Sequence, residues 1–395
     1  MKSVVLLIGA VGFSYMLNKI LLRFSKNFGV DSRQSQNLVR WSSTSKPTTG
    51  GISFFITFLM GSLALLILRP ELPMDSQSLI ALFLSTTLAF MIGFADDAYG
   101  THPSLKFMGQ VACGVILLTF GHHIEFFSKF TDNSAGLWLD YGLTIFWVVG
   151  MMNSLNMLDN MDGVTTTIAL TIVVGTLTMI TFSRGISHDF YLLVAVAGGF
   201  LGFLFWNWRP AKVYMGDTGS MFIGMLAAFV GIKYFWNIHT SPDNLSIIRM
   251  TAIPLMVFIV PIMDTTFVTI ARIARGTSPF VGGKDHLTHN MVRVGVPEEM
   301  VPVVLGLVSM VSGLLAIFAF RLIPEWQVIY SALFGMYPVM LFGLFTYLYI
   351  KGTKIAAMRE KMEQEAAEAS RLTTDAQPDM IPSSAVAEEM MSDSQ

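Results

Sequence analysis

Long apolar segments constrain the fold of this chain more than any other feature of its sequence. About eleven predominantly apolar runs recur, at approximately 3–22, 51–69, 78–95, 105–121, 141–158, 163–182, 189–206, 218–236, 250–271, 299–321 and 328–350. A helix of about 20 apolar residues crosses the hydrocarbon core of a bilayer. Inside lipid a segment must satisfy its own backbone polar groups, which favours helices. The sequence therefore predicts an all-α, polytopic membrane protein of about 11 transmembrane helices.

The composition of the chain supports a membrane protein. Of its 395 residues, 53% are hydrophobic and only 13% are charged, whereas soluble domains carry roughly 25% charged residues. The net charge of −2 gives no reason to expect a nucleic-acid partner. The single cysteine, Cys113, excludes a disulfide framework and a thiolate metal site.

The distribution of lysine and arginine predicts the orientation of the chain. Basic residues collect in four places that alternate crossings put on one side, which is then the cytoplasmic side. They are Arg23, Lys26, Arg33, Arg40 and Lys46, then Arg209 and Lys212, then Arg272, Arg275, Lys284 and Arg293, and finally Lys351, Lys354 and Arg359. We expect residues 1–351 to form the transmembrane domain and 352–395 a cytoplasmic tail, with a short helix followed by an acidic, disordered segment.

Polar residues gather at span ends on this same predicted cytoplasmic side. Asp96 and Asp97 end the third span. The others are Asn153, Asn156, Asp159 and Asp162 after the fifth span, Asn207, Lys212 and Asp217 before the eighth, and Arg275, Asp285, His286 and His289 between the ninth and tenth. The spacing of Asn156, Asp159 and Asp162 puts them on one face if the fifth helix continues through them. We expect a single active site on the cytoplasmic face.

These side chains suit phosphoryl transfer. Carboxylates and carboxamides are the oxygen ligands that Mg²⁺ and Mn²⁺ prefer, and cations such as Lys46, Lys106, Lys212 and Arg275 neutralise phosphate oxygens. Asp217 lies in "MGDTGS", a predicted helix start whose free N–H groups favour anions. Acids for a metal together with cations for phosphate indicate a diphosphate substrate.

Each of these motifs also has an ordinary interpretation. The pair Asp96–Asp97 fits a solvated helix end, "HLTHN" fits a polar loop, and "GDTGS" fits a helix cap. Their joint placement in a chain with so little charge favours an enzyme. The main alternative from another class is a multispan transporter, but transporter acids usually lie near the bilayer midplane, and these lie at span ends.

Six stretches in residues 46–295 carry a resemblance to a known family. They are "KPTTGGI", "GFADDAYG" with "LKFMGQ", "NSLNMLDNMDGVTT", "PAKVYMGDTGSMFIG", "PIMDTTF" and "RGTSPFVGGKDHLTHNMVRVG". With these in order, the chain resembles the polyprenyl-phosphate N-acetylhexosamine-1-phosphate transferases. The resemblance implies Mg²⁺-dependent transfer, with Mn²⁺ as an alternative, of N-acetylhexosamine-1-phosphate from a UDP-sugar to undecaprenyl phosphate, with release of UMP. It implies the first membrane step of a cell-surface glycan pathway, such as cell wall or lipopolysaccharide synthesis.

The same resemblance implies a place and partners for the chain. Family members have ten or eleven spans in the inner membrane and a cytoplasmic active site. The expected partners are a UDP-N-acetylhexosamine, undecaprenyl phosphate and the lipid bilayer, and a homodimer is left open. A branch that uses UDP-MurNAc-pentapeptide remains an alternative, but its three-histidine run does not match "DHLTH".

Roles carry over by position. Asp217 and Asn156 match metal ligands, and Asp96, Asp97, Asp159 and Asp162 match catalytic acids. Lys46, Lys106, Arg275, His286 and His289 match residues that contact the substrates, and we expect Asn207 and Lys212 beside them to bind substrate as well. Two positions depart from the family pattern: Asn160 replaces a frequent Gly, and Asn290 replaces a frequent Arg.

The two adjacent acids are predicted to divide their roles. Neighbouring residues on a helix point about 100° apart, so Asp96 and Asp97 cannot both face one site. We expect Asp96 to face the acceptor phosphate, and Asp97 to support the metal-diphosphate or to order the loop together with Lys106.

Overall fold

The computed structural model describes residues 2–27, 46–131, 134–183, 185–237, 246–278, 283, 285–323 and 326–375. Within these ranges the regular elements are all helices. The predicted segments correspond to α1 (Lys2–Asn27), α2 (Gly50–Leu68), α3 (Ser76–Tyr99), α4 (Pro103–Thr119), α5 (Ser134–Leu158), α6 (Val164–Ser183), α7 (His188–Asn207), α8 (Gly216–Gly231), α9 (Ser246–Val257) with α10 (Ile259–Ala274), α12 (Val301–Leu322) and α13 (Val328–Asp375). A short helix, α11 (Leu287–Arg293), precedes α12. The all-α fold predicted from the sequence is confirmed.

The number of spans is close to the predicted one. Nine helices of the described residues are long and apolar enough to cross a membrane, and α9 with α10 makes a tenth if that bent pair is one span. The remaining candidate, α4, has 17 residues. The count of about 11 therefore stays a prediction.

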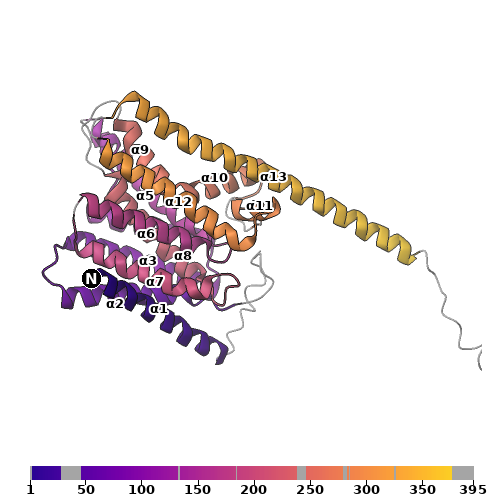
Figure 1. Ribbon diagram of the computed structural model, residues 1–395, viewed down its shortest axis with the longest axis horizontal. Helices are drawn as coiled ribbons and strands as arrows, with labels where there is room; N and C mark the ends of the chain where they lie inside the picture. The colour runs from indigo at the N-terminus through magenta and orange to yellow at the C-terminus, as the bar shows by residue number, and fades with distance from the viewer. Residues whose placement is uncertain are drawn as a thin grey trace, which may run out of the picture.

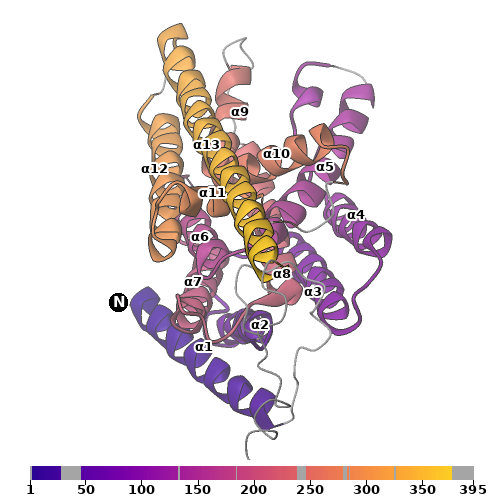
Figure 2. The same ribbon diagram turned by 90° about the vertical axis from the view of Figure 1, so that its right-hand side faces the viewer.

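The predicted ninth span is broken. Its two halves, α9 and α10, meet at an angle of 83°. Pro261 lies in the first turn of α10, where its ring clashes with a helical carbonyl four residues earlier, at Val257, and it has no N–H to donate. Val257 is the last residue of α9, so the break falls where the proline requires it. As a result α10 runs across the bundle rather than along α9 (Figure 2).

Helix α8 forms the centre of the bundle. Over the window that spans Gly216–Trp236, 94% of the residues are buried, and Figure 2 shows α8 between the peripheral helices α4 and α12. Gly93 allows α3 to approach the start of α8, because a Cβ there would lie 2.2 Å from the carbonyl oxygen of Asp217. This close approach brings the acidic end of α3 onto the first turn of α8.

Helix α13 lies on the outside of the bundle and extends beyond it (Figure 1). It continues from Val328 to Asp375 as one helix of 48 residues, so the helix predicted in the tail is continuous with the last span. The structure shows no break at the predicted domain boundary near residue 352. Residues 376–395, predicted to be disordered, lie outside the described residues, as do Arg33, Arg40 and Lys284 of the basic loops.

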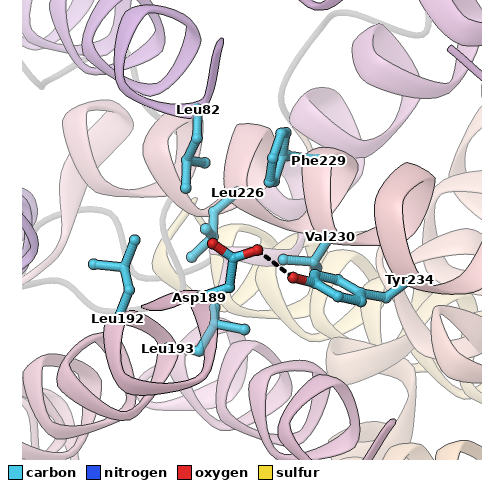
Figure 3. Close-up of a pocket in the computed structure, with 8 residues that line it drawn as sticks. All are labelled: Leu82, Asp189, Leu192, Leu193, Leu226, Phe229, Val230 and Tyr234. Atoms are coloured by element: carbon cyan, nitrogen blue, oxygen red, sulfur yellow. Dashed lines mark hydrogen bonds between the residues drawn. The ribbon is translucent and has the colours of Figure 1, made fainter. Parts of the chain in front are cut away.

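The polar groups lie at two opposite ends of the bundle. At one end, Lys233 and Tyr234 donate to Asp189 at 2.7 and 2.5 Å. Figure 3 shows Asp189 and Tyr234 beside a pocket that is otherwise lined by apolar side chains. This cavity measures about 10 Å³, which is room for about one water molecule, so it is too small for a substrate. The groups predicted to carry the chemistry meet at the other end.

Candidate functional site

Lys106 lies at the centre of a polar cluster built by four helices. It is in the first turn of α4, which begins with Pro103 after the turn that ends α3. Its Nζ donates to Asp217 Oδ2 at 2.6 Å, to Asp96 Oδ2 at 2.9 Å and to Asn156 Oδ1 at 3.4 Å. Asp96 comes from the end of α3, Asn156 from the end of α5 and Asp217 from the start of α8. We call Asp96, Lys106, Asn156 and Asp217 the Lys106 cluster.

The carboxylate of Asp217 is held on both of its oxygens. Lys106 binds Oδ2, and Asn156 Nδ2 donates to Oδ1 at 2.8 Å and to Ser220 Oγ at 2.8 Å. The Asp217 side chain is still 33% exposed, compared with 16% for Lys106 and Asp96. The Lys106 cluster is therefore preorganised by the protein and remains open to a ligand.

Asp97 faces a different element from its neighbour Asp96. Its Oδ1 accepts from the backbone N–H of Asp217 at 3.0 Å, and its Oδ2 accepts from Thr218 N at 2.8 Å and Thr218 Oγ1 at 2.6 Å. These N–H groups belong to the first turn of α8, which has no partner for them within the helix. Gly216, with φ +69°, leaves the space that Asp97 fills, because a Cβ there would lie 2.5 Å from Asp97 Oδ2. Asp97 thus caps α8 from another helix.

The structure turns Asp96 and Asp97 toward different groups, whereas the division of their roles between the acceptor phosphate and the metal-diphosphate stays a prediction. Asp96 and Asp97 point to different groups, as the helical angle requires. Lys106, however, binds Asp96 rather than Asp97, because Asp97 is turned toward the start of α8. The anion predicted at this helix N-terminus is the Asp97 carboxylate of the protein itself.

Asp159 and Asp162 lie in a turn rather than on the fifth helix. Helix α5 ends at Leu158, and Gly163 has φ +76°, so the helical face predicted for Asn156, Asp159 and Asp162 does not form. Asp162 Oδ2 accepts from Ala211 N at 2.9 Å, which ties this turn to the segment before α8. Asp159 directly follows the helix end that carries Asn156.

The segment before α8 is fixed by Asn207, which is buried. Asn207 Oδ1 accepts from Gly163 N at 3.1 Å and from Thr166 Oγ1 at 3.2 Å, while Nδ2 donates to Val213 O at 3.1 Å. Its polar atoms hold the protein together, so the structure places it as a support for the site. Exposed Lys212 has its Nζ 5.7 Å from the centre of the Trp206 ring.

Lys46 lies beside the segment that leads into α8, because the backbone that follows Lys46 is hydrogen-bonded to that segment. Its Nζ is 5.1 Å from the centre of the Tyr214 ring. Tyr214 N donates to Pro47 O at 2.9 Å, and Gly50 N donates to Tyr214 O at 3.0 Å. The segment "KPTTGG" is thus hydrogen-bonded along the residues that lead into Asp217.

The residues that lead from α10 into α11, including His286, form what we call the histidine loop, and acids of α10 and of the loop itself organise it. The Nδ1 atom of buried His286 is 2.9 Å from Asp264 Oδ2 on α10, and Leu287 N donates to Asp264 Oδ1 at 2.7 Å. His289 lies one helical turn further on, with its ring centre 5.8 Å from that of His286. Asp264 was not predicted as a site residue, although a lone acid in an apolar segment such as "PIMDTTF" is itself a functional signal.

Asp285 joins two arginines in the same loop. Arg272 donates to its two oxygens at 3.1 and 2.8 Å, and Arg275 donates to Oδ2. Burial alone would raise the pKa of Asp285, but the hydrogen bonds and charge of Arg272, together with Arg275, lower it to about 2. Arg275, which was predicted as a site residue, therefore forms an ion pair with Asp285. Buried Arg272 also pairs with Asp285 and was not predicted as a site residue.

Helix α11 is attached to the rest of the site from two sides. Thr288 Oγ1 donates to Asn160 Oδ1 at 2.6 Å, which joins α11 to the turn after α5. On the other side, Thr353 Oγ1 of α13 lies 3.5 Å from Asn290 Oδ1. Asn160 and Asn290, the two positions that depart from the family pattern, thus take part in the contacts that hold α11. Because α11 contains His289, we call it the histidine helix.

The chemistry of the Lys106 cluster fits a magnesium site completed by substrate. Two carboxylate oxygens and one carboxamide oxygen converge on a single cationic atom, Lys106 Nζ. No three His, Cys, Asp or Glu side chains among the described residues are grouped as ligands of one ion. Mg²⁺ commonly takes only one or two protein carboxylates and binds the phosphates of its substrate as well. Asp217, Asn156 and Asp96 would supply the protein ligands.

Comparisons with known proteins place this arrangement in a family. The model of glycosyl transferase family 4 matches residues 79–235. A protein of Bacillus subtilis (strain 168), named "Probable undecaprenyl-phosphate N-acetylglucosaminyl 1-phosphate transferase", is 30% identical over 273 residues, which is 69% of this chain and 72% of the relative. The chain belongs to glycosyl transferase family 4.

Other family 4 relatives differ in their named substrates. A decaprenyl-phosphate N-acetylglucosaminephosphotransferase of Mycobacterium leprae (strain TN) is 28% identical over 280 residues, 64% of this chain and 68% of the relative. A phospho-N-acetylmuramoyl-pentapeptide-transferase of Staphylococcus aureus (strain MW2) is 27% identical over 328 residues, 78% of this chain and 96% of the relative. The family 4 match includes every residue of the Lys106 cluster and ends before α11.

Proposed function

We propose that this chain transfers N-acetylhexosamine-1-phosphate from a UDP-sugar to undecaprenyl phosphate and releases UMP. An oxygen of the polyprenyl phosphate attacks the β-phosphorus of the UDP-sugar and forms a new P–O bond. The bond between the β-phosphorus and the bridging oxygen breaks, and UMP leaves with that oxygen. The family membership and the names of the relatives support this reaction class.

The observation that carries the proposal is the convergence of three oxygens on Lys106 Nζ. A diphosphate in transfer needs positive charge on its oxygens and acids that hold a cation. Lys106 supplies a cation that can pair with a phosphate oxygen, while Asp217 and Asn156 lie where a metal would be held. Mg²⁺, if bound there, would neutralise charge on the diphosphate.

The other residues of this end would position the two substrates. Asp96 lies beside Lys106 at the end of α3, and there it would meet the phosphate of a membrane lipid. Asp97 keeps α8 in register with α3, so that Asp217 stays aligned with Lys106. The UDP-sugar would be contacted by Arg275 and His286, which precede α11, and by His289 within α11. Asp159 would lie close to them, because it precedes Asn160, whose side chain binds Thr288 of α11.

The location follows from the same proposal. We assign the chain to the inner membrane, with the Lys106 cluster and the start of the tail on the cytoplasmic side, where UDP-sugars are made available. The basic loop residues that the structure describes support this orientation, because Lys46, Arg209 and Lys212 lie at the end that holds Asp217.

One comparison supports a second candidate for the sugar donor. The Staphylococcus aureus relative is covered over 96% of its length, so UDP-MurNAc-pentapeptide is the alternative donor for the same chemistry. The sequence "DHLTH" in place of a three-histidine run argues for the simpler UDP-N-acetylhexosamine.

The test is a reconstituted reaction with purified full-length protein. Undecaprenyl phosphate, Mg²⁺ and a panel of UDP-sugars are supplied, and UMP release is measured. We expect release that depends on the lipid, on a UDP-N-acetylhexosamine and on the divalent ion, and that stops with EDTA. The Asp217→Asn variant should lose turnover by roughly 100-fold or more while its thermal midpoint changes little. UMP release that is unaffected by EDTA, or by Asp217→Asn in a folded protein, would contradict the proposal.

A further inference from the structure

Asp264 is a fully buried acid that the proposed reaction does not yet use. It lies on α10, after the break from α9, and has 0% exposure. Burying an ionised carboxylate in an apolar bundle costs several kcal/mol unless hydrogen bonds and a cation compensate. Its neighbours on the same helix include buried Met263 and Phe267, so the compensation must come from elsewhere.

Both oxygens of Asp264 are bound to the start of the histidine helix. Leu287 N can only donate, so Asp264 Oδ1 accepts that bond of 2.7 Å. A carboxylate can only accept, so the hydrogen in the 2.9 Å contact with His286 lies on Nδ1. Asp264 therefore fixes both the first free N–H of α11 and the protonation of one imidazole nitrogen.

We propose that Asp264 is a positioning residue that holds His286 as a doubly protonated imidazolium, which donates through Nε2 to the diphosphate of the sugar nucleotide. This role rests on the proposed function, because it requires the diphosphate of a sugar nucleotide as the acceptor. If the hydrogen of a neutral His286 is on Nδ1 and is donated in a hydrogen bond to Asp264, Nε2 carries only a lone pair. That lone pair and the negative charge of a diphosphate repel each other. Only the imidazolium offers an N–H at Nε2 as well, and a buried carboxylate at 2.9 Å is the group that stabilises it.

The other charged groups around this pair do not replace Asp264. Tyr349 of α13 interacts electrostatically with Asp264, and the ring centre of His289 on α11 lies 5.8 Å from that of His286. Arg272 of α10 and Arg275 of the loop interact with Asp285. Asp285, which precedes His286 in the chain, is already bound by the guanidinium groups of Arg272 and Arg275. Asp264 is thus the carboxylate in direct contact with the imidazole.

The first test measures the state of His286 without any substrate. Full-length protein with ¹⁵N-labelled histidine is titrated by NMR, and the His286 signals are assigned among the seven histidines by their loss in His286→Gln. We expect both ring nitrogens to be protonated at neutral pH. His286 that is neutral at pH 7 in the wild-type protein would overturn the inference, whatever the enzyme proves to transfer.

The second test uses Asp264→Asn, which keeps an oxygen for Leu287 N but removes the charge. The Asn amide N–H would then face His286 Nδ1, so the neutral ring would carry its hydrogen on Nε2 and could donate without being charged. The alkaline limb of kcat/KM for the UDP-sugar that reports deprotonation of His286 should therefore disappear in Asp264→Asn and persist in Asp264→Glu. In the His286→Gln background, Asp264→Asn should leave the profile unchanged. A limb that persists in folded Asp264→Asn would contradict the positioning role, even if UMP release confirms the proposed function.

Discussion

Asp96 and Asp97 show how neighbouring residues of the same type acquire different roles. Asp96 binds the Lys106 ammonium and the turn at Thr101, whereas Asp97 accepts three hydrogen bonds from the start of α8. The first arrangement places charge at the open cluster, and the second satisfies backbone groups of a buried helix. We therefore expect Asp96 to matter mainly for turnover and Asp97 mainly for structure.

Isosteric variants separate these two roles. In Asp97→Asn the amide nitrogen would face the donor Thr218 N, so the variant should lose about 1–2 kcal/mol of stability. Asp96→Asn keeps an oxygen for Thr101 and turns its amide nitrogen toward Lys106, whose ammonium still has the acceptors Asp217 and Asn156, so the variant should stay folded and lose turnover by about 100-fold. Thermal midpoints in detergent and UMP release measure both effects. Equal, mild defects in the two variants would refute the division.

The carboxylate of Asp285 predicts a pH dependence of stability. Its pKa is about 2 in the folded chain, below its ordinary value of 3.8. A depressed pKa means that the stabilisation by Arg272 and Arg275 is complete above pH 4 or so and is lost as the pH falls toward 2. The difference in thermal midpoint between wild type and Asp285→Asn should be constant from pH 8 to 5 and shrink below pH 4. A difference that grows on acidification would have the wrong sign.

At the level of elements, the site is assembled from helix ends. Helices α3, α4, α5 and α8 each contribute one terminal residue to the Lys106 cluster, and the first turn of α8 is completed by α3. The histidine helix α11 is added from outside, held by Asn160 on one side and by α13 on the other. Helix α13 thus connects the C-terminal tail to the histidine loop.

Two glycines of α13 give a matched test of this connection. A Cβ at Gly352 would lie 2.7 Å from Asn290 atoms that include its backbone oxygen, whereas a Cβ at Gly343 meets nothing within 4 Å. Gly352→Ala should push α13 away from α11 at a cost of roughly 1–3 kcal/mol, speed hydrogen exchange in α11 and weaken UDP-sugar turnover. Gly343→Ala should leave both unchanged. If the two variants behave alike, α13 does not support the histidine helix.

The sequence predicts these elements better than it predicts their contacts. Apolar length alone locates the helices, because the bilayer sets a minimum span. Apolar length does not show that α5 ends at Leu158 before Asp159. Pro261 is a local signal for the break between α9 and α10, but the continuous apolar run around it predicts a single span. The partners of Asp97 and Asp264 lie more than 20 residues away in the chain, so they depend on packing that no local pattern encodes. The clustering of Asp96, Asn156 and Asp217 was predictable because the alternation of the predicted spans puts all three at the same end of the bundle.

At the level of the whole molecule, the long apolar helices run between two polar ends of the bundle. The Lys106 cluster occupies one end, and the Lys233–Asp189 pair occupies the other, at the opposite terminus of the central segment that begins with α8. Such a separation fits an enzyme that meets its soluble substrate on one side of the membrane only. It does not fit a transport path, whose ionisable groups would lie near the middle of the spans.

Reporter fusions test the orientation of the molecule. A reporter fused after residue 351 should be cytoplasmic, and one inserted in residues 237–248 should be external, because three predicted crossings, an odd number, separate the two positions. Alkaline phosphatase and green fluorescent protein fusions report the two sides. Finding both reporters on the same side would break the alternation on which the placement of the Lys106 cluster depends.

The fate of the β-phosphate tests the central claim most directly. Purified wild-type protein is given undecaprenyl phosphate, Mg²⁺ and UDP-N-acetylglucosamine labelled with ³²P at the β-position, and the lipid and aqueous phases are separated. Because the Lys106 cluster is proposed to act on the diphosphate, the account predicts that the label moves into the lipid while unlabelled UMP is released in equal amount, and that Asp217→Asn abolishes both. Label that leaves as UDP while the sugar alone reaches the lipid would contradict it.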